Sequence, residues 1–155
     1  MLFINYKKEV IEPMDREPIL VYTCGVFDVF HIGHLRMLQY AKGIGDKLIV
    51  AVSTDELVEQ YKFKKTMIPF NERIAIVSAL KCVDVCIPQV DRDKFKAWEK
   101  LGFSIWVVGD DWFGDEYYMI AKEKLTAVNV KSIFFPYTLN ICSTSRKEQI
   151  NSNNE

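Results

Sequence analysis

The chain has 155 residues, of which 49% are hydrophobic and 26% charged, and its formal net charge at pH 7 is −1. This composition is typical of one globular domain with its own core. The balanced charge argues against a nucleic-acid partner. No stretch approaches the roughly 20 apolar residues of a membrane span. At the N-terminus the apolar residues precede the lysines, which is the reverse of the order in a secretion signal. We therefore expect a cytoplasmic protein.

The two ends of the chain differ in composition from its middle. Residues 1–18 carry mixed charges and two prolines and are expected to form an N-terminal arm. Residues 151–155 are polar and are expected to be a disordered tail. The domain itself is expected to span residues 19–150. Its four cysteines form no C-x-x-C pair and match no zinc spacing, which favours free thiols.

Five short apolar runs are rich in Val, Ile and aromatic residues and do not alternate with polar ones. Such runs are typical of strands that are buried on both faces of a parallel sheet. The predicted strands are Ile19–Cys24, Lys47–Val52, Val83–Ile87, Ile105–Val108 and Ser132–Phe135.

Helical segments fall between these runs, and several begin at a capping residue. The predicted helices are Leu35–Lys42, Asp55–Tyr61, Glu72–Leu80 after an Asn71 cap, Arg92–Leu101 after an Asp91 cap and before Gly102, Asp115–Leu125 and Arg146–Ile150. The alternation predicts an α/β fold, a Rossmann-like open five-stranded parallel sheet of order 3-2-1-4-5 with helices on both faces. Ligands then bind at the carboxyl ends of the strands, where the order reverses.

The sequence His31-Ile32-Gly33-His34 lies where the first strand passes into a helix. The N-terminus of a helix favours phosphate, and two histidines three residues apart share one face. A metal site made by the pair and a purely structural role are the alternatives. The preceding turn Gly25–Asp28 favours nucleotide binding, although it is not the G-x-G-x-x-G of dinucleotide-binding folds.

Four other features are expected at the same sheet edge. They are the lysines Lys62, Lys64 and Lys65; Arg73; the loop Val108–Gly114; and the hydroxyl cluster Ser143–Ser145. The lysines could also be a solvated charge run, the loop a plain turn and the hydroxyl cluster a helix cap. Arg73 is a cation in a first helical turn, where it opposes the helix dipole, and this favours a functional role.

Taken together, these residues resemble the H-x-G-H nucleotidyltransferase superfamily, and its cytidylyltransferase group most closely. The resemblance runs from about Ile19 to Ile150. Five stretches carry it: Tyr22–His34, Gly45–Glu56, the lysine loop with Asn71–Arg73, Val107–Trp112 and Ser143–Ser145. The loop Val108-Gly-Asp-Asp-Trp112 is similar to the cytidylyltransferase form, whereas heptose-phosphate adenylyltransferases tend to have K-G-G-D-Y, which favours CTP over ATP.

The resemblance implies an enzyme that transfers a cytidylyl group from CTP to a small phosphomonoester, with glycerol 3-phosphate as the best guess. The products are a CDP-alcohol (CDP-glycerol for that acceptor) and pyrophosphate. It also implies Mg²⁺, with Asp28 contacting the metal through the nucleotide, and a homodimer. The implied catalytic residues are His31, His34, Lys62, Lys64 and Arg73. The implied nucleotide-binding residues are Thr23, Cys24, Gly25, Phe27, Asp28, Gly33, Gly109, Asp111, Trp112, Thr138, Ile141, Ser143, Thr144 and Ser145.

The chain departs from the family pattern at two arginine positions, which are Lys81 and Tyr137 here, and at Leu139 and Asn140 in the last loop. Guanidinium groups bind phosphate with two parallel hydrogen bonds, which Lys and Tyr do not replace. Two alternatives therefore stay open. One is an adenylyltransferase acting on a sugar phosphate, and the other is a CTP-binding subunit with weak or no turnover.

Overall fold

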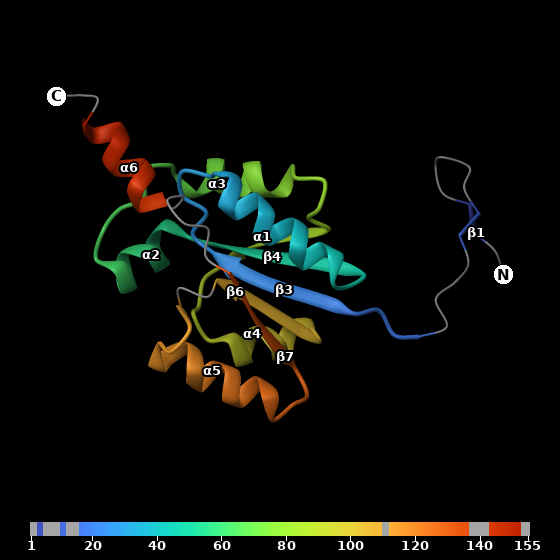
Figure 1. Cartoon of the computed structure of the whole chain (residues 1–155). Coiled ribbons are helices and arrows are strands. Elements are labelled where there is room, and N and C mark those ends of the chain that lie inside the picture. Colours follow the sequence, from blue (N-terminus) through green and yellow to red (C-terminus); the bar gives the residue numbers. More distant parts are fainter. Residues whose placement is uncertain (1–2, 5–9, 12–15, 110–111, 137–142, 153–155) are drawn as a thin grey trace.

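The computed structural model describes residues 3–4, 10–11, 16–109, 112–136 and 143–152 (Figure 1). Two short strands pair antiparallel near the N-terminus, and five longer strands alternate with helices after them. The elements are β1 (Phe3–Ile4), β2 (Val10–Ile11), β3 (Leu20–Gly25), α1 (Ile32–Gly43), β4 (Lys47–Ser53), α2 (Asp55–Lys62), α3 (Phe70–Ser78), β5 (Val85–Gln89), α4 (Lys94–Leu101), β6 (Ile105–Gly109), α5 (Glu116–Thr126), β7 (Lys131–Phe135) and α6 (Ser143–Ser152).

The five-stranded sheet has the order β5-β4-β3-β6-β7, and every neighbouring pair is parallel. Counted along these five strands, the order is 3-2-1-4-5, which confirms the predicted α/β architecture. The chain therefore winds outward from β3 in one direction and then returns to its other side. The reversal places the carboxyl ends of β3 and β6 beside each other, where a ligand crevice forms in such folds.

Alternate residues of the central strands feed two separate cores, one on each face of the sheet. On β4, Val50 packs into one core and Ile49 into the other; on β6, Val107 and Trp106 divide in the same way. Both faces are apolar because helices cover both, and this is why the strand sequences do not alternate in polarity. Helices α1 and α3 cover one face, and α4 and α5 cover the other (Figure 1).

Some predicted boundaries were wrong because side chains distant in sequence or polar caps decide where elements begin. Helix α3 begins at Phe70 after Pro69 rather than after Asn71, since the Asp55 carboxylate accepts the Phe70 N–H across the fold. Helix α4 is capped by Asp93, not Asp91. Asp91 instead accepts the Asp93 N–H and so supports the turn before the cap.

Three further boundaries differ by a few residues. Strand β5 covers Val85–Gln89 rather than 83–87, and it is an edge strand, where Pro88 is tolerated. Helix α1 begins at Ile32, earlier than expected, since His31 is its cap. Helix α6 continues to Ser152, beyond the expected start of a disordered tail. In the described part of the chain, no helix is long and apolar enough to cross a membrane.

Replacing Leu38 with alanine tests how firmly α1 is anchored. The Leu38 side chain is fully buried in the core beneath this helix, so Leu38→Ala leaves a cavity and is expected to lower the free energy of unfolding by about 2–5 kcal/mol. Urea denaturation measures the change. Ile120→Ala removes a side chain that is 47% exposed and should cost less than about 1 kcal/mol. Equal losses in the two variants would contradict this packing.

Candidate active site

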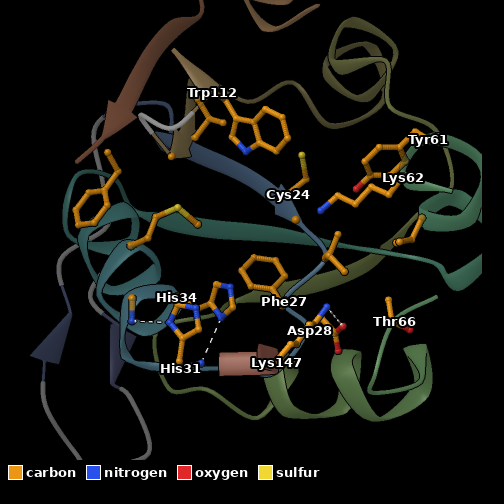
Figure 2. A pocket seen from close by; sticks show the side chains of 18 of the residues that line it. Cys24, Phe27, Asp28, His31, His34, Tyr61, Lys62, Thr66, Trp112 and Lys147 are labelled. Carbon is orange, nitrogen blue, oxygen red and sulfur yellow. Dashed lines mark hydrogen bonds and ion pairs between the residues drawn. The ribbon is translucent and has the colours of Figure 1, made fainter. Parts of the chain in front are cut away.

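A cavity of about 300 Å³ opens at the carboxyl edge of the sheet, between the ends of β3, β6 and β7 on one side and α2 on the other. The start of α1 and the side chain of Lys147 on α6 complete its wall (Figure 2). Among the described lining residues are four lysines and a single carboxylate, that of Asp28. This excess of positive charge favours a polyanionic ligand.

The two histidines cap α1 reciprocally. The Nδ1 atom of His31 accepts the Gly33 N–H at 3.0 Å, and the Nδ1 atom of His34 accepts the His31 N–H at 3.3 Å. An accepting Nδ1 carries no proton, so in a neutral ring the proton sits on Nε2. The rings stack with their centroids 3.9 Å apart. The expected phosphate donors at this helix end are therefore the imidazole Nε2–H groups rather than the Gly33 amide.

His34 is a neutral donor at physiological pH. Burial, reinforced by the neighbouring His31, lowers the pKa of His34 to about 3, against the opposing influence of Asp28. Its ring is also enclosed by Phe27 and Phe30, whose centroids lie 5.5 and 5.2 Å away. The positive charge of the cavity thus comes from its lysines, while His34 offers a hydrogen bond without a charge.

The Asp28 carboxylate is 2% exposed and joins three segments of the chain. It accepts the N–H groups of Met67 and Ile68 at 2.9 Å each, and it pairs with the Lys147 ammonium at 2.5 Å. Burial by itself disfavours the charged form, but Lys147 and the two amides outweigh it and lower the pKa of Asp28. One charge therefore joins three segments: the loop after β3, the residues Met67 and Ile68 that follow the lysine loop, and α6.

Arg73 lies beneath the cavity rather than in its lining, with a side chain that is 1% exposed. Its guanidinium donates to the carbonyls of Val26, Ser53 and Ile68 and forms a 2.6 Å ion pair with Asp55. These contacts explain why a cation is tolerated in the first turn of a helix. They support a positioning role for Arg73 instead of direct contact with a nucleotide.

The loop between β3 and α1 holds two residues in the left-handed region, Phe27 at φ 53° and Val29 at φ 50°. A β-branched residue rarely adopts this conformation, and it persists where the surroundings fix it. Here Arg73 binds the Val26 carbonyl while Asp28 binds the amides of Met67 and Ile68. The buried polar network thus maintains a strained backbone directly before the histidine pair.

The lysine loop follows the end of α2, where Phe63 adopts a left-handed conformation (φ 54°) that stops the helix. Lys62 is half-buried, and its side chain reaches from α2 toward Cys24 at the end of β3 (Figure 2). Lys64 and Lys65 are exposed but also line the cavity. Three lysines from the end of α2 and the following loop therefore line the same cavity as the histidines.

The structure brings most of the predicted site residues to one cavity. Thr23 is buried behind the lining within β3, and Asp111, Thr138 and Ile141 lie outside the described residues, as do the side chains of Ser143, Thr144 and Ser145 at the start of α6. The predicted residues that line the cavity are Cys24, Gly25, Phe27, Asp28, His31, Gly33, His34, Lys62, Lys64, Gly109 and Trp112.

Sequence reasoning missed Lys147 and the aromatic wall formed by Tyr61 and Tyr118. A signal for Lys147 existed, because it is a cation early in a helix that follows a hydroxyl cluster, and such a cation opposes the helix dipole as Arg73 does. Tyr61 and Tyr118 gave no such signal, since tyrosines near helix ends are ordinary. The described cysteines, Cys24, Cys82 and Cys86, are free thiols.

Comparison with known proteins places these features in a family. A family model described as cytidylyltransferase-like matches residues 22–152. Glycerol-3-phosphate cytidylyltransferase of Bacillus subtilis is 35% identical over 137 residues, covering 84% of this chain and 95% of that protein. FAD synthase of Thermococcus sibiricus is 34% identical over 123 residues, covering 79% of this chain and 83% of that protein. A solved lipopolysaccharide core biosynthesis protein from Thermoplasma volcanium gives a TM-score of 0.65 at 29% identity, covering 79% of this chain and 98% of that one.

The low pKa of His34 makes stability depend on pH. Below about pH 6.5 the unfolded chain binds a proton at His34 that the folded chain does not bind until about pH 3, so acidification through this window destabilises the fold. Between pH 7 and pH 5.5 the wild type should lose about 1 kcal/mol more than His34→Gln. Urea denaturation at both pH values measures the difference. An equal loss in both proteins would show that His34 titrates normally.

Proposed function

The chain belongs to the cytidylyltransferase-like family and is a nucleotidyltransferase, and on that premise we propose that it transfers a cytidylyl group from CTP to glycerol 3-phosphate or a related small phosphomonoester. The observation that carries the proposal is the cavity itself. Stacked imidazoles at the start of α1 line the same cavity as lysines from α2, its following loop and α6. Such a cavity suits a triphosphate and a second phosphate together.

The reaction needs little covalent chemistry from the protein. An oxygen of the acceptor phosphate attacks the α-phosphorus of CTP, the bond from that phosphorus to the bridging oxygen breaks, and pyrophosphate leaves. A phosphomonoester is already negatively charged at pH 7, because its second pKa is about 6. No general base is therefore required, and catalysis consists of positioning and charge stabilisation.

The described side chains divide this task by their chemistry. The Nε2–H groups of His31 and His34 donate to oxygens on the α-phosphorus as it becomes five-coordinate. Lys62 and Lys64 bring the acceptor phosphate beside it and offset the repulsion between two anions. Lys147 reaches the triphosphate from α6, and the buried pairing with Asp28 orients it. Trp112 forms the wall beside the base and acceptor.

A resident metal does not fit the described residues. They contain no group of three or more His, Cys, Asp or Glu side chains arranged as metal ligands. The Asp28 oxygens already accept two amides, and the Lys147 ammonium lies where a cation would sit. Mg²⁺ is instead proposed to arrive with CTP, since it favours phosphate oxygens and retained waters over an all-protein cage. An indirect contact of Asp28 with Mg²⁺ through the nucleotide stays a prediction.

The relatives favour one nucleotide and one acceptor over the alternatives. Similarity to glycerol-3-phosphate cytidylyltransferases supports CTP and glycerol 3-phosphate. Similarity to FAD synthases, at nearly the same identity, keeps adenylyl transfer as the second candidate. A homodimer stays a prediction from the family resemblance, and sedimentation velocity would test it.

A substrate panel tests the proposed function directly. We expect CTP with glycerol 3-phosphate to release pyrophosphate and to give a diphosphate diester visible by phosphorus NMR. Phosphocholine, phosphoethanolamine and sugar phosphates form the acceptor panel, and ATP replaces CTP in a parallel series. Turnover with ATP alone would establish adenylyl transfer instead. Thermal stabilisation by CTP without turnover of any acceptor would identify a nucleotide-binding subunit.

Removal of one imidazole donor is expected to lower the rate of turnover. His34→Ala should retain the sheet but lower kcat by about a hundredfold or more, as the removal of single oxyanion donors does elsewhere. Steady-state pyrophosphate release measures kcat, and circular dichroism confirms folding. Gln39→Ala, an exposed change on the same helix, is the control. Turnover close to that of the wild type in folded His34→Ala would remove His34 from the mechanism.

Lys147 is expected to act on the nucleotide rather than on the acceptor. Lys147→Ala should raise the KM for CTP by about tenfold, because a charge-assisted hydrogen bond contributes about 1.5–3 kcal/mol. The KM for the acceptor should change by less than about twofold. Lys124→Ala, an exposed lysine on α5, serves as the matched control. A rise confined to the acceptor KM would show that Lys147 contacts the other substrate.

A further inference from the structure

A continuous series of ring and cation–π contacts connects two parts of the cavity wall. The Arg92 guanidinium lies 4.4 Å from the Tyr61 ring centre and 4.2 Å from that of Tyr117. Tyr117 contacts Tyr118 edge to face, and Tyr118 stacks on Trp112 with centroids 4.8 Å apart. The series thus joins the end of α2, the β5–α4 loop, the start of α5 and the loop after β6. We call it the aromatic series.

Both ends of the aromatic series line the cavity, whereas Arg92 does not. In Figure 2, Trp112 lies at the top of the view and Tyr61 at its upper right, with the Lys62 side chain reaching below Tyr61 toward Cys24. A change at Arg92 can therefore reach a substrate through Tyr61 or Tyr117, but not by direct contact.

The backbone of Arg92 is fixed as firmly as its side chain. Its carbonyl accepts the Tyr117 hydroxyl and the Nζ atom of Lys94, the latter at 2.8 Å. Lys94 is 2% exposed, and its ammonium also lies over the rings of Tyr117 and Tyr118. A buried ammonium costs folding free energy unless it has partners. The contacts of Lys94 with the Arg92 carbonyl and the two rings therefore stabilise the position of this loop.

Tyr61 immediately precedes Lys62 in the last turn of α2. The Lys62 ammonium lies 5.6 Å from the centre of the Tyr61 ring, so one ring contacts two cations, Arg92 and Lys62. A planar guanidinium stacks on aromatic rings in a way that a lysine ammonium does not reproduce. The orientation of Tyr61, which also has a side-chain hydrogen bond to Ser53, therefore depends in part on Arg92, and with it the path of the Lys62 side chain.

We propose that Arg92 is a positioning residue: held between Tyr61 and Tyr117, it fixes the end of α2 so that Lys62 presents its ammonium to the acceptor phosphate. The role of Lys62 in this statement rests on the proposed function. The phosphates of the nucleotide are held by groups on α1 and α6, which do not belong to the aromatic series. Trp112 beside the base is linked to Arg92 only through Tyr117 and Tyr118, whereas Tyr61 contacts Arg92 directly. Arg92 thus governs the acceptor step selectively.

Kinetics of Arg92 variants tests the proposal. Arg92→Ala should raise the acceptor KM by about fivefold to tenfold, the effect of losing the two ring contacts, with the CTP KM changed by less than about twofold. Arg92→Lys should leave the acceptor KM nearly as high as Arg92→Ala does, because a lysine ammonium does not stack on the rings. Lys100→Ala, an exposed cation on α4, is the matched control. Equal rises in both KM values, or full rescue by lysine, would overturn the proposal.

A double-variant cycle shows whether Arg92 acts through Tyr61. Tyr61→Leu should raise the acceptor KM as Arg92→Ala does, and the double variant should be no worse than either single one, because both remove the same contact. Thermal unfolding of all three checks that each is folded. Fully multiplicative effects on the acceptor KM would mean that Arg92 and Tyr61 act independently, which contradicts the proposal.

A labelling experiment separates failure of this inference from failure of the proposed function, because it needs no turnover. Acetic anhydride labels lysines at rates that report their surroundings, and peptide mass spectrometry measures the Lys62 rate relative to Lys47 at the other end of the sheet. Arg92→Ala should raise this ratio at least about twofold, whereas Lys100→Ala should leave it unchanged. An unchanged ratio in Arg92→Ala would overturn the positioning role even if the enzyme turns over CTP.

Discussion

The buried Asp28 carboxylate is the interaction on which the rest of the site depends. Its own loop carries the strained Phe27 and Val29 and leads directly into the histidine pair. The two amides that it accepts fix the segment after the lysine loop, and its ion pair holds α6 against the cavity. A single charge thereby sets the relative positions of imidazoles, lysines and the last helix. A buried carboxylate without these partners would lower the stability of the fold, so alternative arrangements of the three segments are disfavoured.

Different residues of the site supply hydrogen bonds and positive charge. His34 is kept neutral by burial and by its partner ring, so it can donate to a phosphate oxygen without requiring a counter-charge when the cavity is empty. The lysines, placed nearer solvent, supply the positive charge. Arg73, whose side chain is 1% exposed, is bound by Asp55 and three carbonyls. It stabilises the backbone that carries the other groups.

The sequence predicted the sheet and about half of the residues that line the cavity, for clear physical reasons. Strands buried on both faces are apolar throughout, and parallel connections place residues such as His31, Gly109 and Lys62 at one edge. What it did not predict depends on contacts between segments distant in the chain. The first N–H of α3, that of Phe70, donates to Asp55 from another helix, and the partner of Lys147 is Asp28, 119 positions earlier in the chain. Neither contact has a local signature.

Hydrogen exchange of the Met67 and Ile68 amides tests the organising role of Asp28 most directly. Both amides donate to this carboxylate, and the Leu48 amide, which donates to Asp84, provides an internal reference. In Asp28→Ala the two amides should exchange about tenfold faster or more relative to Leu48, since a lost carboxylate bond corresponds to roughly 1.5–3 kcal/mol. Exchange rates unchanged from the wild type, in a folded variant, would contradict the account.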